Sequence, residues 1–105
     1  MNSILAVLIA ASQTYYVAKV PSFGCNSIED LSQLQSVRSD EKALRIALTE
    51  KQSYGQCVEI LKGTVVEGSI DTTDTRILRV NMQVDPPGYE APLDDFELKA
   101  ADGKQ

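Results

Sequence analysis

Histidine and tryptophan are absent from this sequence, and no glycine-rich phosphate-binding loop is present. Without histidine, the common Ser–His and Cys–His catalytic pairs cannot form. The common zinc sites need four Cys or His ligands, whereas this chain has two cysteines and no C-x-x-C spacing. We therefore expect a protein that is not an enzyme and that holds no metal or other cofactor.

Basic residues are few and scattered. Ten Lys and Arg residues stand against 15 Asp and Glu residues, which leaves a net charge of −5 at pH 7. Because nucleic-acid binding requires a basic stripe along the phosphates, we expect no nucleic-acid partner. The hydrophobic fraction of 43% and the charged fraction of 24% are typical of a globular domain rather than a disordered chain.

A long hydrophobic run is also missing. The apolar stretch at residues 4–11, I-L-A-V-L-I-A-A, is far shorter than the roughly 20 residues of a membrane span. It matches the hydrophobic region of a secretory signal peptide, with small residues at 10–12 for cleavage, although no Lys or Arg precedes it. We predict that residues 1–12 are a signal peptide, that the protein is periplasmic or secreted, and that no stable membrane insertion follows cleavage. The alternative is a buried N-terminal strand.

Cys25 and Cys57 are the two cysteines of the chain. Because exported proteins meet an oxidising environment, we predict a disulfide between them. In the chain-entropy model, closing a loop of this length stabilises the fold by roughly 3.7 kcal/mol. That is a large contribution for the single small core that 105 residues can build. The alternative is a pair of buried thiols in a cytosolic protein.

Residues 13–105 are expected to form one domain, whose first half is largely helical. Residues 13–20 favour a strand and 22–26 a turn. Two helices are predicted over residues 27–51, because capping residues precede two apolar stripes at helical spacing. The stripes consist of Ile28, Leu31 and Leu34, then Leu44, Ala47 and Leu48. Glu41 and Arg45 stand at i, i+4 and are expected to pair.

The second half has the pattern of short strands separated by turns. Apolar, β-branched residues at 57–66 flank a Lys62-Gly63 turn, and strict alternation predicts a strand at 78–84. The other expected elements are a polar connector at 68–75, a turn at 85–88, a short strand at 89–91 and a helical turn at 93–96.

Three segments of this half resemble the bacterial SH3-like domains: L-K-G-T-V-V at 61–66, R-I-L-R-V-N-M at 76–82 and G-Y-E-A-P-L-D-D-F-E-L at 88–98. The whole layout, with Cys25 opening a helical pair and Gly55-Gln56-Cys57 leading into the strands, resembles small exported bacterial proteins of uncharacterised role. The resemblance implies an α+β fold in which an N-terminal helical pair packs on a small SH3-like β-barrel at 55–99. It also implies binding of a protein or peptide.

Acidic residues are concentrated at the C-terminal end. Residues 84–105 contain six acids and two bases, a local balance of −4. This pattern indicates either an ordinary solvated surface or an acidic face for a partner, with aromatic side chains as anchors. The candidate partner-binding residues are Tyr89, Asp94, Asp95 and Phe96.

The function that these observations favour is an exported, non-enzymatic, protein- or peptide-binding module. One alternative is a small inhibitor or immunity-type protein that covers a basic active site with its acidic C-terminal face. A third, less favoured interpretation is a carboxylate-dependent hydrolase using one of the acid pairs Glu29/Asp30, Asp71/Asp74 or Asp94/Asp95.

Overall fold

A computed structural model describes residues 14–81 and 88–99 of this chain, and these residues form an antiparallel sheet with two α-helices. The strands are β1 (Tyr15–Ala18), β2 (Ser22–Cys25), β3 (Cys57–Ile60), β4 (Val65–Ile70), β5 (Ile77–Asn81), β6 (Tyr89–Pro92) and β7 (Phe96–Leu98). The helices are α2 (Ile28–Ser36), α3 (Glu41–Ser53) and the single 3₁₀ turn η1 (Leu93–Asp95). The predicted signal peptide at 1–12 and most of the predicted turn at 85–88 lie outside the described residues.

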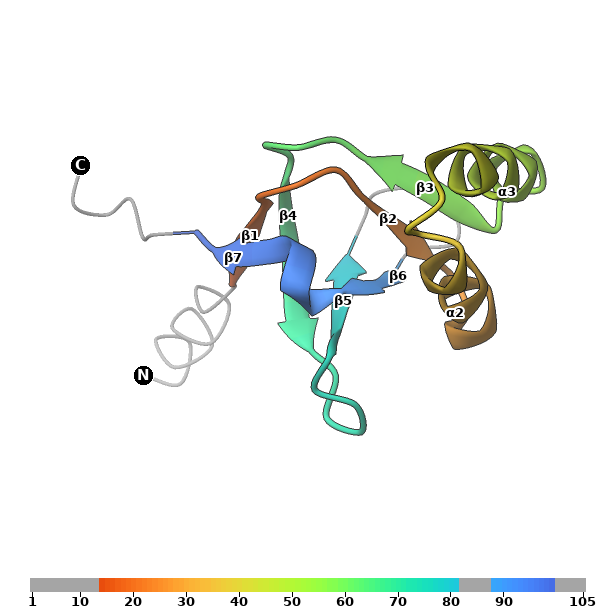
Figure 1. Cartoon of the computed structure of the whole chain (residues 1–105). Helices are drawn as coiled ribbons and strands as arrows, with labels where there is room; N and C mark the ends of the chain where they lie inside the picture. Colours follow the sequence, from red (N-terminus) through yellow and green to blue (C-terminus); the bar gives the residue numbers. More distant parts are fainter. Residues whose placement is uncertain (1–13, 82–87, 100–105) are drawn as a thin grey trace, which may run out of the picture.

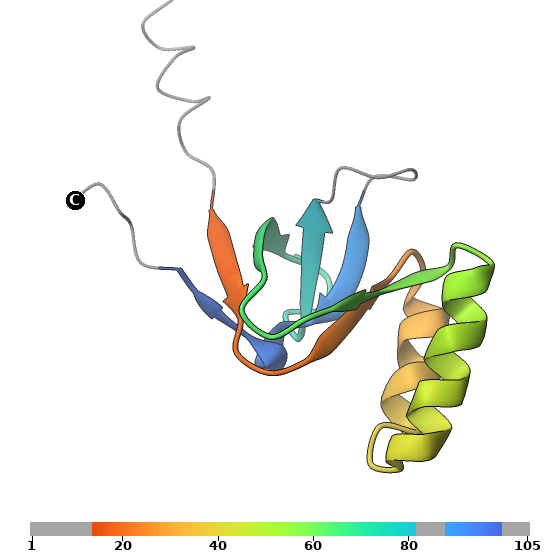
Figure 2. The same cartoon turned by 90° about the horizontal axis from the view of Figure 1, so that it is seen from above.

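The seven strands form one open sheet in the order β3-β2-β6-β5-β4-β1-β7 (Figure 1). The expected α+β class is confirmed. The sheet does not close, because the two end strands, β3 and β7, have no strand pairing with each other. It curls instead, so that β1 and β7 face β5 and β6 across the hollow of the sheet (Figure 2).

A long bent ribbon organises the sheet. It consists of residues 14–26 and 56–68, in which β1 pairs with β4 and β2 pairs with β3 in the same register, with Tyr15 opposite Glu67 and Ser22 opposite Ile60. The strand pairing is interrupted at the bend, at residues 19–21 and 61–64. Backbone hydrogen bonds continue the ladder past both strand pairs, from Gly68 N–H to Thr14 O at 3.1 Å and from Asn26 N–H to Gln56 O at 2.9 Å. The two helices therefore occupy the tip of this ribbon.

The helical pair is not N-terminal to the strands as predicted, since β1 and β2 precede it and belong to the sheet. The expected turn at 22–26 was wrong for the same reason: this segment is β2, paired with both β3 and β6. Gly24 suggested a turn, but its role is close packing, because a Cβ there would lie 3.1 Å from Cβ of Tyr89. Pairing within the sheet overrides the local turn preference.

The predicted helices are confirmed, with small differences at their ends. Ser27 caps α2 by accepting from the Asp30 N–H at 3.1 Å, and Asp40 caps α3 by accepting from the Ala43 N–H at 3.0 Å. The apolar stripes face the sheet except at Ile28, which is 46% exposed. No helix among the described residues is long and apolar enough to cross a membrane.

Two apolar clusters lie on opposite faces of the sheet. The inner core, inside the curl, consists of Tyr16, Ala18, Ile60, Val66, Leu78, Val80, Ala91 and Phe96. The helix-side core consists of Phe23, Cys25, Leu31, Leu34, Leu48 and Cys57. Alternation along β3 sends Ile60 to the inner core and Cys57 to the helix-side core, as its pattern predicted.

The Lys62-Gly63 turn is present, but the strands on either side of it do not pair with each other. β3 pairs with β2, whereas β4 pairs with β1 and β5. The connector predicted at 68–75 is shorter, because β4 continues to Ile70. Gly68 permits this pairing, since a Cβ there would lie 2.7 Å from the Arg79 carbonyl oxygen.

The predicted disulfide is confirmed. Cys25 and Cys57 are directly opposite each other on β2 and β3, with their Cα atoms 4.0 Å apart, and both are almost completely buried. The bridge therefore joins the two points where the chain leaves the ribbon for the helices and returns. It closes the helical pair into a covalent loop.

Reduction of this bridge is expected to destabilise the protein by about 3–4 kcal/mol, because the unfolded chain regains the entropy of an open loop. For a domain of this size, the melting temperature should fall by more than about ten degrees. Thermal unfolding with and without a reductant measures the loss. Cys25→Ala, Cys57→Ala and the double variant should be similar to one another, since each deletes the same bond. An unchanged melting curve on full reduction contradicts the prediction.

Candidate functional site

The four predicted partner-binding residues do not form an exposed surface. Tyr89 and Phe96 are each 4% exposed and Asp95 is 7% exposed, so only Asp94 is open to solvent. Phe96 belongs to the inner core. The burial of both aromatic rings argues against their use as interface anchors, and the partner-binding role of this segment stays a prediction.

Asp95 is occupied by an internal contact instead. Its Oδ2 accepts a hydrogen bond from Ser22 Oγ at 2.5 Å and lies 2.7 Å from an Arg38 guanidinium nitrogen. Arg38 comes from the loop between α2 and α3, where it also donates to the Pro21 carbonyl oxygen and lies 5.0 Å above the Phe23 ring. One guanidinium makes all three contacts, so it joins the loop between the two helices to η1. We call this contact the Arg38–Asp95 latch.

The other predicted acid pairs are also occupied by neighbouring groups. Asp71 accepts from the Thr73 N–H and hydroxyl, and Asp74 pairs with Arg76 at 3.0 Å. These hydrogen bonds lower the pKa of both aspartates. Among the described residues, no three Cys, Asp or Glu side chains are grouped so that they could hold a metal ion.

Asp30 holds the two helices together. Its carboxylate lies 2.9 Å from Lys51 Nζ and accepts from Ser27 Oγ, and both charged side chains are mostly buried. The hydrogen bond from Lys51, with a smaller contribution from Ser27, lowers the pKa of Asp30 despite its partial burial. This contact adds an interhelical link to the apolar packing.

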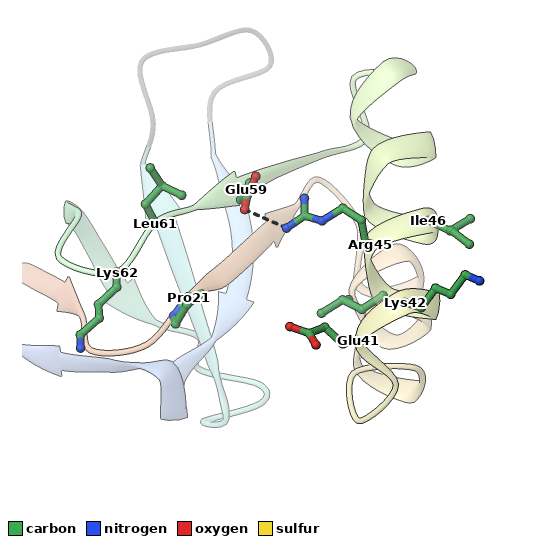
Figure 3. Close-up of a pocket in the computed structure, with 9 residues that line it drawn as sticks. Pro21, Glu41, Lys42, Arg45, Ile46, Glu59, Leu61 and Lys62 are labelled. Carbon is green, nitrogen blue, oxygen red and sulfur yellow. Dashed lines mark hydrogen bonds and ion pairs between the residues drawn. The ribbon is translucent and has the colours of Figure 1, made fainter.

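An open groove of about 640 Å³ lies between α3 and the bend of the ribbon (Figure 3). Its α3 wall consists of Glu41, Lys42, Leu44, Arg45 and Ile46, and its strand wall of Pro21, Glu59, Leu61 and Lys62. Sequence reasoning singled out none of these residues as a binding site. The two walls of the groove come from segments far apart in the chain, so no local motif marks these residues.

Charges inside the groove are partly matched. Arg45 points from α3 across the groove to Glu59, at 3.3 Å, and not to Glu41 as the i, i+4 spacing predicted (Figure 3). Lys42 and Ile46 point away from β3. Glu41 and Lys62 have no ion-pair partner among residues 14–81 and 88–99. Lys42 also has no ion-pair partner among these residues, and the Lys62 side chain extends from the bend away from α3 (Figure 3).

Leu61 supplies apolar surface on the strand wall. It lies at the bend just after β3 and is 63% exposed. The only sequence signal for this position was a leucine directly before a Lys-Gly turn, where a polar residue is more usual. An exposed leucine beside an open groove can contact an apolar group of a ligand.

Comparisons with protein-family models, curated proteins and solved structures gave no match.

Removal of the Arg38–Asp95 latch should lower the free energy of unfolding more than removal of an exposed ion pair does. Arg38→Ala leaves the buried Asp95 carboxylate without its cation and is expected to lower the free energy of unfolding by about 1–3 kcal/mol. The matched control is Arg45→Ala, whose exposed pair with Glu59 should contribute less than about 1 kcal/mol. Urea unfolding at pH 7 measures both. Equal losses for the two variants contradict a structural role for the latch.

The Asp30–Lys51 contact should make stability depend on pH in the acidic range. Because the folded-state pKa of Asp30 lies below its ordinary value of 3.8, the contribution is fully present above that value. It is lost as the pH falls through the lowered pKa. Urea unfolding from pH 2 to 7 should therefore show a difference between wild type and Asp30→Asn that shrinks on acidification. A pH-independent difference for Asp30→Asn contradicts the assignment.

Proposed function

We propose that this protein is a non-enzymatic module that binds a protein or peptide in the groove between α3 and the bend of the ribbon. The observation that carries the proposal is the groove itself. Its volume of about 640 Å³ lies within the usual range of ligand sites, roughly 300–1,000 Å³. It combines apolar surface at Leu61 and Pro21 with charged groups at Arg45, Glu59 and Lys62.

Its open form favours a chain-like ligand over a small enclosed one. The groove runs along an edge of the sheet, and its walls carry no group of side chains with an evident catalytic arrangement. Glu59 is paired with Arg45, which leaves it poorly placed to act as a free general base. A macromolecular ligand is therefore the better match to this surface.

We further propose that the sheet is related to the SH3-like domains. A curled antiparallel sheet and the 3₁₀ turn η1 between β6 and β7 support this relation. The open edge at β3 departs from a closed barrel. The buried disulfide supports export to an oxidising compartment, where such a bond persists.

The alternative of an acidic inhibitory face has less support. Of the C-terminal acids among the described residues, Asp95 is buried in the latch and Glu90 pairs with Arg79 at 3.2 Å. Asp94 and Glu97 are left as exposed acids, which is an ordinary density for a surface.

A charge placed at Leu61 should weaken ligand binding without unfolding the protein. Random peptides displayed on phage are selected on the immobilised oxidised protein, and affinities of the enriched peptides are measured by calorimetry. Leu61→Glu should lower the affinity for these peptides by about tenfold or more, which corresponds to about 1.4 kcal/mol. It removes an apolar contact and introduces a charge without a partner.

Leu98→Glu is the matched control, because Leu98 is similarly exposed, at 65% against 63%, but lies on the opposite edge strand. It should leave affinity unchanged. Failure to enrich any peptide, or equal effects of both variants, argues against the groove as the binding site.

A further inference from the structure

β7 forms one end of the sheet, on the side away from the helices (Figure 1). Within residues 14–81 and 88–99, β1 is its only strand neighbour. Lys19 N–H donates to Asp95 O, and Lys99 N–H donates to Tyr15 O, both at 2.9 Å. Hydrogen-bonded pairs alternate with non-hydrogen-bonded pairs along an antiparallel ladder. These two bonds, one on each side of β7, therefore define the direction of every backbone group in the strand.

The backbone groups of Phe96 and Leu98 point away from β1. Glu97 lies opposite Val17 and, by the alternation, forms a hydrogen-bonded pair with it. Phe96 is 4% exposed, and its N–H already donates to Leu93 O. Leu98 differs from Phe96 because it is 65% exposed. A further strand can therefore reach this edge at Leu98, where an outward N–H and C=O accompany an exposed apolar side chain.

The opposite edge of the sheet, at β3, is less accessible. α3 packs beside β3, and Cys57 and Ile60 at the two ends of that strand are almost completely buried. Unpaired N–H and C=O groups at an exposed edge pair readily with another chain. Of the two edges, β7 is therefore the one at which a further strand is expected to add.

The segment Glu97-Leu98-Lys99 is complementary to itself in the antiparallel direction. When two copies pair about a two-fold axis at Leu98, this leucine lies opposite Leu98 of the second copy. Glu97 of each copy then lies opposite Lys99 of the other. The N–H and C=O of the two Leu98 residues bond to each other, as in a hydrogen-bonded pair. Opposite charges in facing positions stabilise strand pairing, so both copies gain from this register.

Other two-fold registers are less favourable. An axis at Glu97 would place two carboxylates directly opposite each other, and like charges in that position are destabilising. An axis at Glu97 or at Phe96 would also require the backbone of Phe96, which is buried. An axis between two residues would place an outward-facing residue opposite one that faces β1, which breaks the hydrogen-bond pattern. The axis at Leu98 avoids all three problems.

We infer that two copies of this protein associate through β7, with a two-fold axis at Leu98, so that their sheets join into one antiparallel sheet. The contact involves few residues of each copy, so the dimer should be weak and should dissociate on dilution. It lies at the opposite end of the sheet from β3 and the groove. The inference is therefore independent of the proposed function.

Sedimentation equilibrium of the oxidised protein tests the association. Between about 10 μM and about 1 mM, the average mass should rise from that of one chain toward that of two. The amide resonance of Leu98 should shift over the same concentration range. A single-chain mass at every concentration overturns the inference. Concentration-dependent shifts at β3 or in the groove, with none at β7, overturn it as well.

Exchange of the two charges tests the register. Glu97→Lys alone, or Lys99→Glu alone, places like charges opposite each other and should raise the dimer dissociation constant by about tenfold or more. An equimolar mixture of these two variants should associate again, because opposite charges then face each other in the heterodimer. Glu50→Lys, on the exposed surface of α3, makes the same change in net charge as Glu97→Lys and should leave association unchanged. A mixture that fails to associate, or an equal loss with Glu50→Lys, overturns the inferred pairing.

Leu98→Glu separates this association from peptide binding. It places two carboxylates at the centre of the contact and should keep the protein in the single-chain form up to about 1 mM. The affinity of the selected peptides for the groove should not change, since the groove lies at the other end of the sheet. An undiminished dimer overturns the inference, whatever the result for the groove.

Discussion

The register shared by the β1–β4 pair and the β2–β3 pair is the constraint on which the other features depend. It places Cys25 directly opposite Cys57, so that the bridge forms between neighbouring strands. It also sends alternate side chains to opposite faces of the ribbon, which allows the inner core and the helix-side core to form on the two sides of one sheet. A shift of one residue would exchange these faces and separate the cysteines.

The helical pair at the tip of the ribbon is attached at both ends. The disulfide holds the end where the chain leaves and re-enters the sheet, and the Arg38–Asp95 latch holds the loop between the helices. Because α3 forms one wall of the groove and the ribbon forms the other, these two attachments determine the separation of the walls. The width of the groove therefore depends on how the helices pack against the sheet.

Local patterns were sufficient for much of the secondary structure. Capping residues and apolar stripes located both helices, and strict alternation located β5 and the face assignment of β3. The short strand predicted at 89–91 corresponds to β6. The errors fell at Ser22–Cys25, predicted as a turn, and at the end of β4. In both places a glycine suggested a break, whereas its lack of a side chain allows close approach within the sheet.

The sequence by itself was enough to predict the α+β class and the disulfide, because these follow from the spacing of apolar residues and from a pair of cysteines. Only the tertiary structure decided which residues lie at the surface. The sequence suggests Tyr89 and Phe96 as interface anchors, but both are buried. Leu61, directly after β3, is 63% exposed at the bend. Which strand forms an edge depends on pairings between distant segments, and local sequence carries no signal for them.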